Sequence, residues 1–124
     1  MQASQSSSHD VVSQERLDEL NTLIGEQLPL VLNTYIDTSS INVDELLNAQ
    51  ERRDYIHMAS VCHKLKGSAS SIGATNLPQL CVQLEELLNQ TKDINEIPKV
   101  LSMIQTENSA IIHTLKNYLN SLNT

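Results

Sequence analysis

The sequence has few aromatic residues and few residues that form turns. Its 124 residues include three Tyr but no Phe or Trp, and only three Gly and three Pro. So little turn material disfavours a fold of many strands, and the scarcity of stacking side chains disfavours binding to single-stranded nucleic acid. With 40% hydrophobic residues, the composition favours one helical domain with an aliphatic core.

Signals for secretion, membrane insertion and nucleic-acid binding are also missing. Two cysteines make no disulfide framework, no apolar run approaches the ~18 residues of a transmembrane helix, and the polar start is unlike a signal peptide. Eight basic residues against 15 acidic ones give a net charge of -7, which disfavours nucleic acid and anionic lipid as partners. We therefore expect a soluble monomer in the cytoplasm.

Apolar residues recur at helical spacing from Ser13 onward, whereas residues 1–12 are rich in Ser and Gln. We predict a flexible tail over 1–12 and one domain over 13–124, an all-α, up-down antiparallel four-helix bundle with short additional N-terminal helices. Asn42 and Glu45 resemble a capping box that would start a separate short helix. The expected helices span about 13–25, 28–36, 42–47, 54–72, 77–88 and 97–122.

The predicted helix over residues 54–72 has an unusual outer face. At about 100° per residue, a core stripe is formed by Met58, Val61, Cys62, Leu65, Ala69 and Ile72. The opposite side carries His63 with Ile56, Ala59, Ser60, Lys66, Gly67 and Ser70. A solvated face normally carries Glu, Lys, Gln and Arg. Gly67 costs a helix about 0.5–1 kcal/mol relative to Ala, and one reason to keep it is the close approach of another surface. A tolerated glycine on an ordinary surface helix is the alternative.

Charge separates this helix from the rest of the chain. No Asp or Glu occurs in residues 55–84, where Lys64 and Lys66 carry +2, and the remaining chain carries -9 within the total of -7. His63 and Lys66 are three residues apart and therefore share a helix side. They form an electropositive site suited to a phosphoryl group.

An imidazole can attack phosphorus at neutral pH. Its unperturbed pKa is near 6.5, so one ring nitrogen is available as a nucleophile while an acceptor holds the N–H of the other. Glu85 or Gln83, on the next predicted helix, could provide that acceptor for His63.

The segment from His63 to Glu85 resembles the signature of histidine-containing phosphotransfer (HPt) domains, roughly H-x-L-K-G-S-S/A, then G-A, L-x-x-L-C and L-E. The matching residues are His63, Leu65, Lys66, Gly67, Ser68, Ala69, Gly73, Ala74, Leu77, Leu80, Cys81, Leu84 and Glu85. Such domains are four-helix bundles that carry phosphoryl groups between aspartates of response-regulator receiver domains in multistep phosphorelays.

The resemblance implies a role for each matched polar residue. His63 would be the phosphoacceptor, Lys66 the charge partner of the phosphoryl group, and Glu85 the acceptor of the imidazole N–H. The receiver domain would dock on Ile56, Ala59, Ser60, Lys64, Gly67 and Ser70. Ala69 stands where many members of the family have a second serine.

The resemblance also sets expectations about cofactors and context. The chain has no nucleotide-binding loop, so we expect it to use no ATP and to have no catalytic activity alone. We expect it to need no cofactor of its own, because magnesium would be held by the receiver domain. The tail over 1–12 suggests the C-terminal module of a hybrid sensor kinase, tethered to the inner membrane through that parent; a free-standing relay protein is the alternative.

Two further function classes remain open. A non-catalytic helical interaction module would keep the docking face without phosphorylation. A histidine-kinase dimerisation domain is a weaker fit, because the residues after His63 lack the acid and the proline of that motif.

The remaining His, Cys and Tyr residues have structural interpretations. We expect no metal site from His9, His57 or His113, and Cys62 and His63 point about 100° apart on their helix. Cys62 and Cys81 are expected to be reduced core residues on two packed helices. Bundle packing is expected of Tyr35, Tyr55 and Tyr118.

Overall fold

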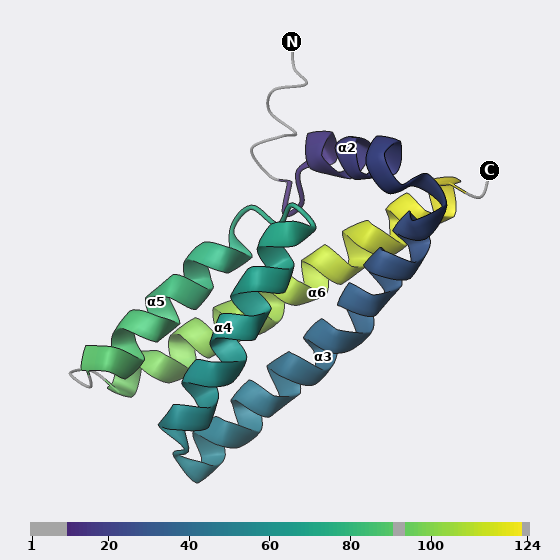
Figure 1. Ribbon diagram of the computed structural model, residues 1–124. Helices are drawn as coiled ribbons and strands as arrows, with labels where there is room; N and C mark the ends of the chain where they lie inside the picture. Colours follow the sequence, from purple (N-terminus) through teal and green to yellow (C-terminus); the bar gives the residue numbers. More distant parts are fainter. Residues whose placement is uncertain (1–9, 91–93, 123–124) are drawn as a thin grey trace.

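The computed structural model describes residues 10–90 and 94–122, which form four long helices with a short helix across one end (Figure 1). The short helix is α2 (Gln14–Ile24), and the long ones are α3 (Leu28–Arg52), α4 (Tyr55–Ser71), α5 (Leu77–Gln90) and α6 (Ile97–Leu122). Single 3₁₀ turns at Gly25–Gln27 and Ile94–Glu96 lead into α3 and α6. α4 packs against α3 and α5, and α6 packs against the same two helices. The predicted all-α antiparallel bundle is confirmed.

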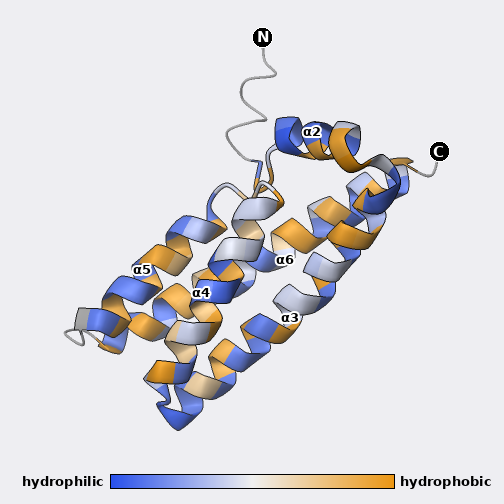
Figure 2. Cartoon of the chain, in the orientation of Figure 1, coloured by the Kyte–Doolittle hydropathy of each residue, from blue (hydrophilic) through white to orange (hydrophobic). Residues whose placement is uncertain are grey.

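The core of the bundle is aliphatic. Tyr35 is the single aromatic residue among the buried positions of the described ranges, and the rest are mainly Leu, Ile, Val and Ala. Orange hydrophobic segments alternate with blue hydrophilic ones along the helices, as amphipathic packing requires (Figure 2). The predicted core stripe of α4 is confirmed, since each of its six residues is at most 2% exposed.

One predicted break between helices is wrong. The separate helices expected over 28–36 and 42–47 are a single helix, α3, and Asn42 lies buried inside it rather than at a cap. The intervening run lacks Gly and Pro, and the hydroxyl groups of its two serines bond within the helix. Ser39 and Ser40 donate to the carbonyl of Ile36 at 3.4 and 2.9 Å. Polar residues therefore occur here without ending the helix.

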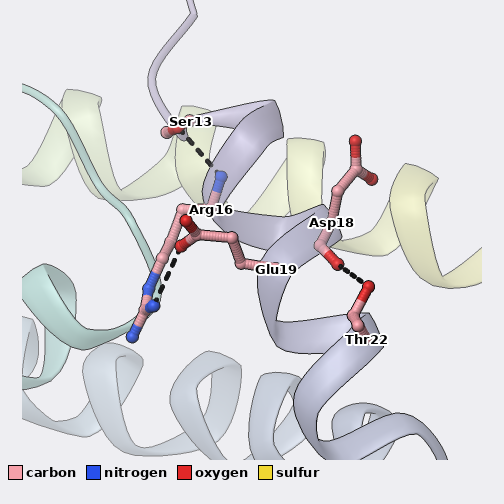
Figure 3. A network of polar contacts seen from close by, with 5 residues as sticks. All are labelled: Ser13, Arg16, Asp18, Glu19 and Thr22. Carbon is pink, nitrogen blue, oxygen red and sulfur yellow. Dashed lines mark hydrogen bonds and ion pairs between the residues drawn. The ribbon is translucent and has the colours of Figure 1, made fainter.

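The predicted ends of the other helices are largely confirmed. Asp54 caps α4, its side chain accepting from the backbone N–H of His57 at 3.1 Å, and Gly73 follows the helix with φ 89°. Ser13 caps α2 in the same way, accepting from the N–H of Arg16 at 3.1 Å, and Arg16 pairs with Glu19 one turn later (Figure 3).

The predicted flexible tail needs correction over residues 10–12. The N–H of Ser13 donates to the carbonyl of Gly73 at 2.8 Å, and the N–H of Thr75 donates to that of Val11 at 2.9 Å. Val12 is 3% exposed and belongs to the core. The extended segment 10–13 is therefore fastened to the turn between α4 and α5, and the folded domain includes Asp10. Residues 1–9 lie outside the described residues.

Candidate functional site

α4 presents His63 at the middle of its length. The helix begins after the Asp54 cap and ends before Gly73, and its apolar stripe is fixed against α3 and α5. This anchoring turns the opposite side outward, and the His63 side chain is 75% exposed. An exposed imidazole on a rigid helix is available to a partner molecule.

Lys66 and Glu85 adjoin His63 at the boundary between α4 and α5. Lys66 Nζ donates to Glu85 Oε1 at 2.8 Å, and Glu85 Oε2 lies 3.6 Å from His63 Nδ1. Glu85 is on α5 and reaches these groups because α4 and α5 pack side by side. One carboxylate therefore faces both the imidazole and the ammonium group, and His63 Nε2 is the ring nitrogen not facing it.

The three side chains differ in exposure. Lys66 is 29% exposed and Glu85 is 22% exposed, so their ion pair is partly shielded from water. The hydrogen bond with Glu85 is the main cause of a raised pKa for the Lys66 ammonium group. Lys66 is therefore held in its charged form beside the exposed imidazole.

Gln83 was the alternative acceptor for the imidazole N–H. It is exposed and lines a groove with Glu86, Leu87, Glu96 and Val100, between α5 and the start of α6. The structure thus brings Glu85, and not Gln83, to His63.

The predicted docking residues lie at the surface of α4. Ile56 is 87% exposed, more than any other large apolar side chain in the described ranges. Ser60, Lys64, Gly67 and Ser70 are also exposed, whereas Ala59 is half-buried. A Cβ atom added at Gly67 would meet no atom within 4 Å. The fold itself therefore has no steric need for glycine at this position.

A groove beside α4 was missed by sequence reasoning. It has a volume of about 380 Å³ and lies between the first half of α3 and the end of α4, lined by Leu30, Val31, Thr34, Tyr35, Thr38, Ser68, Ser71 and Ile72. Leu30 is 64% exposed and Val31 is 37% exposed. The available signal was the run of three apolar residues from Leu30 to Leu32, which spans about 200° of a helix and is too wide for one core-facing stripe.

The cysteines are buried reduced thiols, as predicted. Cys62 Sγ donates to the backbone carbonyl of Cys81 at 3.2 Å, and both residues are inaccessible to solvent. Contact with Cys81 and burial raise the pKa of the Cys62 thiol. Cys62 is the sequence neighbour of His63, but its nucleophilic thiolate form is disfavoured.

The other singled-out residues lie away from this site or serve packing. His113 is exposed on α6, within 3.3 Å of Asn117, and His9 lies outside the described residues. His57 is half-buried in the first turn of α4. Tyr35, Tyr55 and Tyr118 pack on the core as expected.

The described ranges contain neither a cluster of metal-binding side chains nor a helix able to span a membrane. Nowhere in residues 10–90 and 94–122 do three or more His, Cys, Asp or Glu side chains gather in a way that could hold a metal ion. Within the same residues, every helix is too short or too polar to cross a membrane.

Known proteins resemble this chain in sequence. The Hpt domain profile matches residues 30–123. The phosphorelay protein LuxU of Vibrio harveyi is 26% identical over 78 residues, which are 62% of this chain and 68% of LuxU.

Solved structures agree in fold. Histidine-containing phosphotransfer protein B of Pseudomonas aeruginosa PAO1 superposes with a TM-score of 0.82 at 21% identity, covering 87% of this chain and 93% of that one. The maize histidine-containing phosphotransfer protein ZmHP2 gives 0.80 at 20% identity, covering 94% and 95%.

A four-helix bundle with an exposed mid-helix histidine defines the class of histidine phosphotransfer domains. The chain belongs to the Hpt domain family, since the family profile covers more than half of it. Its function is histidine phosphotransfer in two-component signalling, in which HPt domains of phosphorelays interact with receiver domains.

Proposed function

We propose that His63 is the residue that carries the phosphoryl group. The observation that carries this assignment is the exposed imidazole at the middle of α4, with Lys66 and Glu85 beside it. An aspartyl phosphate of a receiver domain approaches α4, and His63 Nε2 attacks its phosphorus in line with the departing aspartate oxygen. The N–P bond forms as the P–O bond breaks, and the aspartate carboxylate leaves with the electron pair. Reversal of these steps loads a second receiver.

Glu85 and Lys66 have distinct roles in this proposal. Glu85 accepts from the Nδ1–H of His63, which keeps the lone pair on Nε2 for the attack. The 3.6 Å separation from Nδ1 is slightly beyond a hydrogen bond and closes with a small side-chain movement. Lys66 balances negative charge on the phosphoryl oxygens. Magnesium is bound by carboxylates of the receiver, and this chain brings no cofactor.

The receiver docks on the α4 face made by Ile56, Ala59, Ser60, Lys64, Gly67 and Ser70. The exposed Ile56 supplies apolar contact at one end, and the bare backbone at Gly67 leaves room beside His63. The groove between α3 and α4 adjoins this face and offers a second apolar contact. Such a modest interface suits a relay, because the partner must leave after transfer. We further propose that the chain acts as a monomer in the cytoplasm.

The test of the phosphoacceptor is transfer from phosphorylated receiver domains of the source organism. His63→Gln is expected to abolish labelling, and the wild-type label is expected to be acid-labile and base-stable. His57→Gln, on the same helix, is the matched control and is expected to label normally. Undiminished labelling of His63→Gln would refute the assignment.

A further inference from the structure

In the unmodified protein, Lys66 already forms an ion pair with Glu85. Its Nζ lies 2.8 Å from Glu85 Oε1, and both side chains are largely covered. Glu85 is the main cause of the raised pKa of Lys66. A phosphoryl group on His63 would therefore have to draw Lys66 away from an existing partner.

Glu85 also has a second group to bind. Its other oxygen, Oε2, is 3.6 Å from His63 Nδ1, too far for a good hydrogen bond while Oε1 is tied to Lys66. After the attack by Nε2, the ring retains its Nδ1 proton and becomes positively charged. The attraction between this ring and Glu85 then strengthens, while the new phosphoryl oxygens attract Lys66.

We propose that Glu85 is a positioning residue that changes partners during transfer. It holds Lys66 while His63 is unmodified, and it shifts to the His63 Nδ1–H when Lys66 pairs with the phosphoryl group. This inference rests on the proposed phosphoacceptor role of His63. Because the ion pair must loosen, Lys66 stabilises phosphohistidine less than an unpaired lysine would. That restraint keeps the phosphoryl group transferable to the next aspartate.

Competition between Glu85 and the phosphoryl group for Lys66 predicts the direction of the coupling in a double-mutant cycle. The four proteins are wild type, Lys66→Gln, Glu85→Gln and the double variant, with phosphoramidate as the donor. At a fixed phosphoramidate-to-ammonium ratio, ³¹P NMR gives the ratio of phosphorylated to free protein, approached from both directions. Lys66→Gln should lower this ratio in both backgrounds. Because Lys66 is unpaired when Glu85 is replaced, the fold decrease should be roughly three to ten times larger in the Glu85→Gln background than in wild type. An equal or smaller factor would overturn the inference.

Glu86 offers a matched control on the same turn of α5. Its side chain is exposed, and it lines the groove on the α5–α6 side rather than the His63 site. Glu86→Gln removes the same charge nearby, and the effect of Lys66→Gln should be unchanged in that background. A change equal to that caused by Glu85→Gln would assign the effect to net charge and overturn the inference.

A second donor separates failure of this inference from failure of the proposed function. Labelling by a phosphorylated receiver domain that persists in His63→Gln would refute the phosphoacceptor assignment. Phosphorylation confined to His63, with no coupling between Lys66 and Glu85, would refute the partner change alone. Far-UV circular dichroism of each variant confirms that these surface substitutions leave the bundle folded.

Discussion

Gly67 lies one turn beyond His63 on the same side of α4, and a Cβ atom at Gly67 would contact nothing within 4 Å. Helix propensity alone favours alanine there by about 0.5–1 kcal/mol. We therefore expect Gly67→Ala to raise the free energy of unfolding by about that amount, measured by urea denaturation. Gly73→Ala is the contrasting control, because its Cβ would lie 2.8 Å from Arg16 Cβ at a φ of +89°. That variant should be destabilised.

A larger side chain at Gly67 tests the clearance that we propose for the receiver. Gly67→Gln should slow phosphotransfer from a receiver domain by about tenfold, which corresponds to about 1.4 kcal/mol of lost transition-state stabilisation. Phosphorylation by phosphoramidate should be unaffected, since this small donor needs no protein docking. Equal slowing with both donors would indicate damage to His63 itself and would contradict the clearance role.

A buried hydrogen-bond chain joins α3 to α6. Tyr35 Oη donates to Asn108 Oδ1 at 2.7 Å, and Asn108 Nδ2 donates to Ser39 Oγ at 3.0 Å. Asn108→Ala would leave both hydroxyl groups without this partner, and we expect a loss of about 2 kcal/mol in the free energy of unfolding. Asn117→Ala, exposed on the same helix, should change it by less than about 0.5 kcal/mol. Equal effects at the two sites would contradict a structural role for the chain.

The features predicted from the sequence are those that depend on local spacing. The α4 stripe and the Asp54 cap follow from periodicity and from capping chemistry, and the structure confirms both of them. The positive charge expected beside His63 is balanced at Lys66, because Glu85 of the next helix pairs with that side chain. Asn42 was misread because its position in the bundle, not its intrinsic preference, decides whether it caps a helix or lies inside one. The Tyr35–Asn108 bond joins residues far apart in the chain, and no local pattern reports such a pairing.

In the site, too, contacts between different helices could not be predicted from local spacing. His63 and Lys66 are neighbours on one helix and could be paired from spacing. The choice between Glu85 and Gln83 depends on how α5 is rotated against α4, which only the packing determines. The groove between α3 and α4 needs both helices in place, so the sequence alone could not locate it.

The segment before α2 contributes to stability mainly through the buried side chain of Val12. Val12 is 3% exposed. Backbone hydrogen bonds hold the residues on either side of it to the α4–α5 turn: the N–H of Ser13 donates to Gly73, and the N–H of Thr75 donates to Val11. Val12→Ala should lower the free energy of unfolding by about 1–3 kcal/mol, because it leaves a cavity in the core. Val82→Ala, at a position 39% exposed, is the matched control and should have a much smaller effect. A silent Val12→Ala would mean that the segment detaches in solution.

Burial of Tyr35 links stability to alkaline pH. Removal from water raises the pKa of its phenol well above the usual value of about 10, so the folded state holds this proton more tightly than the unfolded state does. The resulting stability is complete below about pH 10 and is lost above it, by up to about 1.4 kcal/mol per pH unit. Tyr35→Phe removes this dependence but leaves that of Cys62, whose raised pKa acts in the same direction. The stability advantage of wild type over Tyr35→Phe, measured by urea denaturation from pH 7 to 11, should therefore shrink above about pH 10. A difference that stays constant across that range would show that Tyr35 ionises as freely in the folded state as in the unfolded one.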